Sequence, residues 1–294
     1  MPLEMLARND VLGDKFAHLY KSGNVIRHED CEGVALREML PERGLHNTNI
    51  EYDLWYDMGG DREIHGYTYT DLLNSFIYVR PANFHFAQRT MLDSLESDIT
   101  AEGRGLVERI AQKTGDKYRL RTVLERHDFV VFLPGTNIIN QAFDWHLGKQ
   151  AVEQGAKFKP HPLTSVSLLR HLKNMYGDDN VLDKRMSGHE LLAGADIVGC
   201  CANSEMGIAA IARGCGFHMF SPDSVSHEGK SLTYSSIYRA LLRGGSYKEN
   251  LQRLVSCETS GLISSAAQDA QKRIDAFFNQ FKEVRHVEPR NPCD

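Results

Sequence analysis

The sequence predicts an α/β fold in two lobes, with a parallel sheet covered by helices on both faces in the C-terminal lobe. From residue 128 onward, short apolar runs alternate with segments of helical periodicity, which is typical of βαβ units. A chain of 294 residues is also long enough for two domains that each bury a core. We therefore expect an N-terminal α/β lobe over residues 1–127 and a C-terminal lobe with a helical tail over residues 128–294.

The elements of the C-terminal lobe follow from strands that end in turn residues and helices that begin at capping residues. The expected strands span 128–135, 157–159, 180–183, 196–201 and 215–220. The expected helices span 139–155, 164–177, 187–195 and 204–214, and three of them open on Ser or Thr. Five strands and four crossover helices within about 95 residues have the density of a Rossmann-like domain.

The N-terminal lobe is harder to interpret because charges interrupt its short apolar runs. Its expected strands span 24–29, 49–57 and 75–80, and its expected helices span 31–40 and 84–113. Residues 119–127 are expected to bridge the lobes. The tail over 231–284 is expected to be helical, with Gly244 and Gly245 as its clearest break.

Composition indicates a globular protein that stays in the cytoplasm. No apolar run approaches the roughly 20 residues that cross a bilayer, and the N-terminus lacks the apolar region of a signal peptide. The six cysteines show no spacing that would organise a zinc ion, and adjacent Cys200 and Cys201 fit a core strand. A net charge of −5 argues against a protein that coats nucleic acid non-specifically.

The segment KFKPHPLTS (157–165) places a basic strand, a His-Pro turn and a Ser/Thr-capped helix in direct succession. The free N–H groups and the dipole of a helix N-terminus favour an anion such as phosphate. The alternative is a plain loop in which the two prolines only end the strand. The candidate binding residues here are Lys159, His161, Pro162, Thr164 and Ser165.

A second candidate, CCANSEMGIAAIARG (200–214), is again a strand that runs into a helix. Asn203, Ser204 and Glu205 stand at the start of that helix, and the small residues that follow allow a ligand to approach closely. The alternative is a serine N-cap on a tightly packed core helix. Both candidates follow strands of one parallel sheet, at the edge where such sheets bind ligands.

Two further loops belong to the same predicted edge. Gly135, Thr136 and Asn137 follow the first strand of the lobe, without the glycine spacing of a dinucleotide site or of a P-loop. Lys184 and Arg185 follow the strand at 180–183, where they are candidates to contact a diphosphate or, in the alternative, solvated surface charges.

The order of these motifs over residues 128–222 resembles the nucleotide-binding half of GT-B glycosyltransferases, especially the capsule-type and sialyltransferase-like families. It is also similar to the related UDP-sugar 2-epimerases and to phage DNA glucosyltransferases. The resemblance implies a compact GT-B-like fold of two Rossmann-like lobes and a nucleotide-sugar donor as co-substrate, with no tightly bound cofactor. It implies donor contacts at His161, Pro162 and Ser204. Many UDP-sugar enzymes carry a ribose-binding Glu where this sequence has Ala209 and Ala210, and Glu205 is the nearby acid.

Sugar transfer with inversion needs a base that deprotonates the acceptor hydroxyl. The candidates are Asp30, Asp57 and Asp61, which lie in acidic loops of the N-terminal lobe, and the alternative for each is an ordinary surface loop. No D-x-D motif flanked by strand residues is present, so we expect no metal ligands, and helix N-termini would stabilise the leaving diphosphate.

The expected function is transfer of a sugar from a nucleotide sugar to a hydroxyl acceptor. The acceptor is expected to be a glycan precursor or a 5-hydroxymethylpyrimidine in DNA. Two alternatives stay open: a nucleotide-sugar epimerase, which needs no acceptor, and a non-catalytic module that binds a nucleotide or a nucleic acid.

Overall fold

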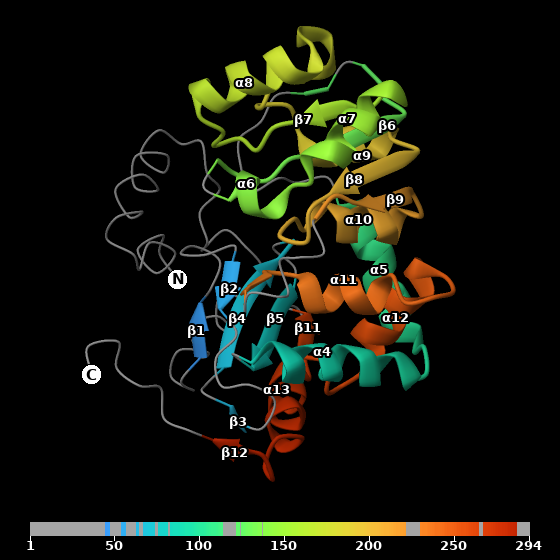
Figure 1. The fold of residues 1–294 in the computed structure, drawn as a ribbon. Coiled ribbons are helices and arrows are strands. Elements are labelled where there is room, and N and C mark those ends of the chain that lie inside the picture. The colour runs from blue at the N-terminus through green and yellow to red at the C-terminus, as the bar shows by residue number, and fades with distance from the viewer. Residues whose placement is uncertain are drawn as a thin grey trace, which may run out of the picture. The chain divides into compact units, whose positions relative to one another are not determined.

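The structure of the protein is a computed structural model (Figure 1). The structure describes residues 45–47, 54–56, 63–64, 67–73, 76–81, 83–113, 122–123, 125–136, 138–221, 230–264 and 267–286. The chain forms two compact units: unit 1 comprises residues 1–107 and 229–294, and unit 2 comprises residues 108–228. Within the described ranges, no helix has the length and apolar character needed to span a membrane.

Unit 2 contains the parallel sheet that the sequence predicts. Its strands, in spatial order, are β7 (Lys157–Lys159), β6 (Phe129–Phe132), β8 (Ile197–Cys200) and β9 (Gly216–Met219). All neighbouring pairs are parallel, and Val181 forms a parallel bridge to Phe158 on the outer side of β7. When the bridge at Val181 is counted as a third strand, after β6 and β7 in the chain, the spatial order is 3-2-1-4-5, which is that of a doubly wound α/β sheet. The predicted α/β fold class is confirmed.

The helices of unit 2 connect these strands. They are α6 (Ile139–Ala142), α7 (Trp145–Glu153), α8 (Val166–Tyr176), α9 (Gly188–Gly194) and α10 (Met206–Arg213). The chain steps from β6 to β7 in one direction and from β8 to β9 in the other. Because such crossovers are right-handed, their helices cover opposite faces of the sheet.

The single helix expected over 139–155 is in fact two helices. Asp144 caps the second one, since its Oδ1 accepts hydrogen bonds from the backbone N–H of His146 and of Leu147. The ring of Phe143 turns into the core and stacks on Phe220, with ring centroids 5.8 Å apart. Capping and aromatic packing together interrupt a pattern that is periodic in the sequence.

Unit 1 contains a mixed sheet. Its strands, in spatial order, are β1 (Leu45–Asn47), β4 (Tyr67–Leu72), β5 (Phe76–Pro81) and β11 (Leu262–Ser264). The pair β1 and β4 is parallel, whereas β4 with β5 and β5 with β11 are antiparallel. Two short pairs accompany it: β2 (Leu54–Tyr56) with β10 (Lys230–Leu232), and β3 (Glu63–Ile64) with β12 (Arg285–His286).

The helices of unit 1 are α4 (Phe84–Asp93), most of α5 (Ala101–Gln112), α11 (Ser235–Leu241), α12 (Tyr247–Ser256) and α13 (Ala270–Asn279). The helix expected over 84–113 is broken between α4 and α5. Ser94–Glu96 forms a 3-10 turn there, and Thr100 Oγ1 accepts a hydrogen bond from Gly103 N at 2.9 Å, which starts α5.

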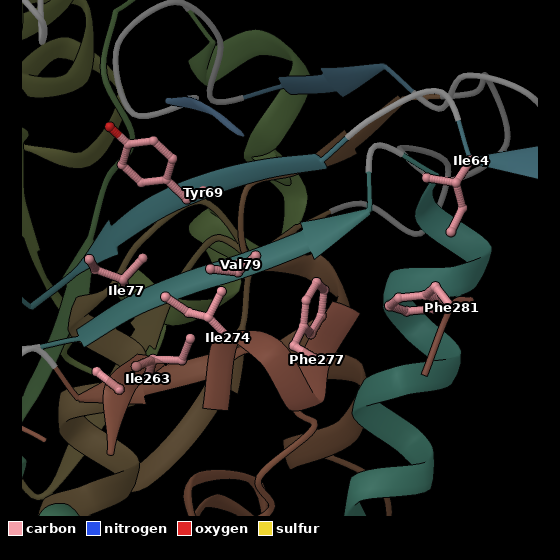
Figure 2. Close-up of a cluster of buried hydrophobic side chains, with 9 residues drawn as sticks. Ile64, Tyr69, Ile77, Val79, Ile263, Ile274, Phe277 and Phe281 are labelled. Carbon is pink, nitrogen blue, oxygen red and sulfur yellow. The ribbon is translucent and has the colours of Figure 1, made fainter. Parts of the chain in front are cut away.

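The C-terminal tail packs with unit 1, although its position in the sequence suggests the second lobe. Its strands β10, β11 and β12 pair with β2, β5 and β3. Its apolar side chains complete a buried cluster with β3, β4 and β5 (Figure 2), made of Ile64, Tyr69, Ile77, Val79, Ile263, Ala270, Ile274, Phe277 and Phe281. The expected helical tail therefore also contains strands.

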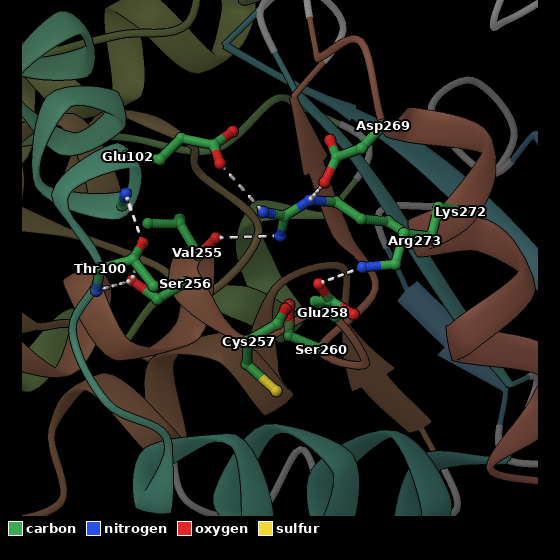
Figure 3. A network of polar contacts seen from close by, with 11 residues as sticks. Thr100, Glu102, Val255, Ser256, Cys257, Glu258, Ser260, Asp269, Lys272 and Arg273 are labelled. Carbon is green, nitrogen blue, oxygen red and sulfur yellow. Dashed lines mark hydrogen bonds and ion pairs between the residues drawn. The ribbon is translucent and has the colours of Figure 1, made fainter.

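Arg273 lies at the centre of a polar network in unit 1 (Figure 3). Its side chain is 6% exposed, while those of its partners Glu102 and Asp269 are 53% and 36% exposed. The guanidinium pairs with Asp269 at 3.0 Å and with Glu102 at 3.5 Å, and it donates to the Val255 carbonyl at 3.4 Å. The network is asymmetric because the buried arginine makes all three contacts, whereas each carboxylate makes one of them and is partly solvated.

We expect Arg273→Met to lower the free energy of unfolding by about 2 kcal/mol, through lost charged hydrogen bonds. Glu102→Gln is expected to cost less than about 1 kcal/mol, because that carboxylate is solvated. Urea unfolding of the two variants measures both changes. Equal losses would contradict the asymmetry.

Candidate ligand-binding edge of the parallel sheet

The topology of unit 2 marks one position on the carboxyl edge of its sheet. From β6 the chain moves to β7 on one side, and it later returns to β8 on the other side. The order of strands therefore reverses between β6 and β8, and the loops that leave these two strands diverge. Open α/β sheets bind ligands at such a switch point. The two loops are residues 133–138 and 201–205.

The loop after β6 is connected to the loop after β7. Leu133 N donates to the Lys159 carbonyl at 3.0 Å, and Thr136 Oγ1 accepts a hydrogen bond from Ser165 N at 2.9 Å. The Gly135 carbonyl accepts from Ile138 N and Ile139 N, which begins α6. The structure thus brings the predicted residues Thr136 and Ser165 together. Asn137 lies outside the described residues.

The loop after β7, residues 160–165, contains the His-Pro turn. His161 and Pro162 are half-buried. Nδ1 of His161 accepts a hydrogen bond from Leu163 N at 3.2 Å, which requires that nitrogen to be unprotonated. A neutral imidazole that accepts at Nδ1 carries its proton on Nε2.

The same loop ends at the N-terminus of α8. Ser165 is the N-cap, and its Oγ accepts from Leu168 N at 3.3 Å. Thr164 is 1% exposed, and its hydroxyl has no hydrogen-bond partner among the described residues. Because buried hydroxyls are normally satisfied, this one calls for a water molecule or a ligand atom.

The two predicted lysines donate to main-chain carbonyl oxygens of these loops. Lys159 is 3% exposed, and its Nζ donates to Pro160 O at 2.8 Å and to Lys184 O at 2.9 Å. Lys184 Nζ donates to Thr164 O at 2.7 Å. Arg185 is exposed and forms a local pair with Asp183, 3.8 Å between Nε and Oδ1. The lysines therefore hold the loops, and Arg185 lies on the surface.

The loop after β8 leads into α10. Ser204 Oγ accepts from Met206 N at 3.3 Å, and Glu205 occupies the N-cap position without a capping bond from its side chain. Asn203 Oδ1 is buried and has no partner among the described residues. An amide oxygen only accepts hydrogen bonds, so a ligand that satisfies it must offer an O–H or N–H group.

The small residues of α10 have a packing role. Gly207, Ala209 and Ala210 are buried, which lets the helix lie close to the sheet. This agrees with the alternative interpretation of the motif, a tightly packed core helix. Cys200 and Cys201 are fully buried, as the sequence predicts. Burial raises the pKa of the Cys201 thiol well above its usual value, and the neighbouring Cys200 raises that pKa further. Cys201 is thus a protonated core residue.

Sequence reasoning missed Ser221, which follows β9. Its Oγ accepts a hydrogen bond from Ala202 N at 2.8 Å and so supports the loop after β8. A serine directly after the last predicted strand was the available signal. The predicted catalytic residues Asp30, Asp57 and Asp61 lie outside the described residues. Among those described, no three His, Cys, Asp or Glu side chains are grouped so that they could hold a metal ion.

No protein-family model and no curated protein matches this sequence significantly. Among solved structures, the chain is similar to Thermosulfurimonas dismutans KpsC, beta Kdo 2,7 transferase. The TM-score is 0.41 and the sequence identity 14%, over 84% of this chain and 89% of that chain. Since this likeness is loose, the chemistry of the loops is what bears on function.

Proposed function

We propose that the chain is a glycosyltransferase that moves a sugar from a nucleotide-sugar donor to a hydroxyl acceptor, and that unit 2 binds the donor. The observation that carries the proposal is the 3-2-1-4-5 sheet with Asn203 in a loop of its switch point and with His161 and Thr164 in the loop after the adjacent strand β7. The motif-level resemblance of residues 128–222 to GT-B enzymes supports the same assignment.

The proposed donor is bound by complementary groups. The N-terminal N–H groups of α8 and α10 favour phosphate oxygens. His161 Nε2–H is suited to donate to an oxygen of the leaving group, and Asn203 Oδ1 to accept from a ribose hydroxyl or a base amine. Stabilising the negative charge of the departing phosphate by fixed donors is the main catalytic effect in this scheme, which needs no metal.

The proposed acceptor is a hydroxyl of a glycan precursor. One of Asp30, Asp57 or Asp61 is proposed to remove the proton from that hydroxyl as the sugar–phosphate bond breaks. The acceptor oxygen then bonds to the anomeric carbon, and the nucleotide leaves with its phosphate. A hydroxymethylated base in DNA is a competing acceptor that the same assay tests.

The test is a transfer assay with a panel of UDP, CMP and GDP sugars, chosen first by the rise in melting temperature that each nucleotide causes. Oligosaccharides and hydroxymethylated duplex DNA are offered side by side. Sugar found on an oligosaccharide supports the proposal. Sugar found on DNA alone would identify the hydroxymethylated base, and not a glycan, as the acceptor. Donor converted with neither acceptor modified indicates an epimerase or hydrolase, and nucleotide binding without any turnover indicates a binding module.

Removal of the predicted donor contacts should slow transfer more than it destabilises the fold. We expect His161→Ala and Ser204→Ala each to lower kcat/KM about 30-fold, equivalent to about 2 kcal/mol of transition-state stabilisation. The Ser204 change should lower the free energy of unfolding by only about 1 kcal/mol, because it removes one hydrogen bond to the start of α10.

Ser246→Ala is the matched control for the serine variant. Ser246 caps α12 in unit 1 through Glu249 N at 3.3 Å, the same distance as Ser204 Oγ to Met206 N. It should lose similar stability and keep full turnover. Equal kcat/KM in all three variants and the unchanged chain would refute the site assignment.

A further inference from the structure

Two lysine ammonium groups link three pieces of main chain at the carboxyl edge of unit 2. Lys159 Nζ donates to Lys184 O at 2.9 Å, and Lys184 Nζ donates to Thr164 O at 2.7 Å. Lys159 thus holds the main chain at Lys184, and Lys184 holds the main chain at Thr164. We call this succession of two contacts the lysine relay. On the opposite side, Thr136 Oγ1 accepts from Ser165 N at 2.9 Å. Loop 160–165 is therefore held from both neighbouring loops.

The position of these charges is electrostatically unusual. Thr164 directly precedes Ser165, the N-cap of α8, so Lys184 Nζ lies next to the positive end of the helix dipole. Cations are favoured at the opposite end of a helix. The first turn of α8, which the structure describes completely, contains no acidic residue that would compensate. An anion bound at this turn would relieve the repulsion.

A second feature of the loop points to a ligand independently of charge. The hydroxyl of Thr164 is buried without a hydrogen-bond partner among the described residues. A hydroxyl can donate to a phosphate oxygen. The relay therefore ends at a residue whose own side chain has an unsatisfied polar atom.

We propose that Lys159 and Lys184 are positioning residues that hold loop 160–165 as a binding loop for a phosphate group, with Thr164 and the first turn of α8 as its donors. This deepens the proposed function and rests on it only in assigning the phosphate to the donor substrate. The substrate class is a phosphate ester. Binding depends on where Lys184 holds the Thr164 backbone, and the ammonium charge adds to the attraction.

The test uses the full chain and inorganic pyrophosphate, titrated by calorimetry at a temperature well below the melting point. We expect Lys184→Met and Lys159→Met each to weaken pyrophosphate binding about tenfold or more. Lys184→Arg, which keeps the charge and the donors, should remain within about threefold of the unchanged chain. Such rescue separates positioning from a general loss of stability.

Lys157→Met is the matched control on the same strand. Lys157 begins β7 as Lys159 ends it, and its Nζ likewise donates to a main-chain carbonyl, Asp179 O, at 3.0 Å. It lies at the amino edge, away from loop 160–165. Its variant should bind pyrophosphate as the unchanged chain does. An equal loss in Lys157→Met, or full binding in Lys184→Met, would overturn the inference.

A second measurement needs no variant and covers the case in which a methionine substitution prevents folding. Pyrophosphate should slow backbone hydrogen exchange at residues 163–168 of the unchanged chain. Protection confined to other segments, or no binding at millimolar pyrophosphate, would overturn the inference. The pyrophosphate experiments contain no sugar donor, so their outcome does not depend on sugar transfer. A chain that binds pyrophosphate here but transfers no sugar would refute only the proposed transferase.

Discussion

Replacing Gly261 with alanine is expected to destabilise unit 1 by about 3–5 kcal/mol, from the combined cost of left-handed backbone and overpacking. Gly261 precedes β11 with a φ of +79°, and a Cβ there would lie 2.1 Å from the Val79 carbonyl oxygen and 3.0 Å from the Phe277 ring. The obstacle is backbone of β5, which cannot move aside. The Gly261 carbonyl also accepts a hydrogen bond from Val79 N at 2.8 Å, so displacement breaks the sheet edge.

Thermal unfolding followed by circular dichroism measures this change, and we expect the melting temperature to fall by about 10 °C. Gly245→Ala is the control, because Gly245 has a φ of +70° and no atom of the described residues within 4 Å of an added Cβ. Only the backbone term of about 1 kcal/mol applies to it. Equal shifts in the two variants would show that the close contact with β5 is not what requires glycine.

The second large effect is expected for Gly199→Val in β8, about 3 kcal/mol from overpacking. A Cβ at Gly199 would lie 2.4 Å from the Phe220 ring and 3.1 Å from Val131 Cγ2. Phe220 must then move. Its carbonyl accepts from Asp144 N at 2.7 Å, and the next residue, Ser221, supports the loop that contains Asn203. Nucleotide affinity should therefore fall together with stability.

Gly216→Val is the matched control on the neighbouring strand β9. Its added Cβ would meet no described atom closer than 3.5 Å, and the position is exposed. Urea unfolding and nucleotide titration are measured for both variants. If Gly199→Val lost stability but kept nucleotide affinity, the loop after β8 would not depend on Phe220 and Ser221.

The strands and helices of unit 2 could be predicted from sequence because their signals are local. Buried parallel strands are continuous apolar runs, as in Phe129–Phe132. Ser165 and Ser187 are N-cap residues, and a serine before an amphipathic segment predicts the start of a helix. What could not be predicted depends on distant partners. The three-residue strand β11 is defined by its pairing with β5, some 180 residues earlier in the chain.

The candidate site divides in the same way. Position at the carboxyl edge follows from strand order, so the loops of Thr136, His161 and Ser204 could be found from the sequence. The role of each side chain could not be found from the sequence. Lys159 looks like a ligand-binding charge in the sequence, but its ammonium group donates to Pro160 O and Lys184 O. Which carbonyl a lysine reaches is decided by tertiary packing.

The central claim is that a nucleotide sugar binds where the strand order of unit 2 reverses. A crystal structure with the nucleotide that most raises the melting temperature tests it directly. The claim predicts the nucleotide at the carboxyl ends of β6 and β8, with its phosphate at the first turn of α8 or α10 and a donor group within hydrogen-bond distance of Asn203 Oδ1. A nucleotide bound at the amino edge of the sheet, or on unit 1 alone, would contradict it.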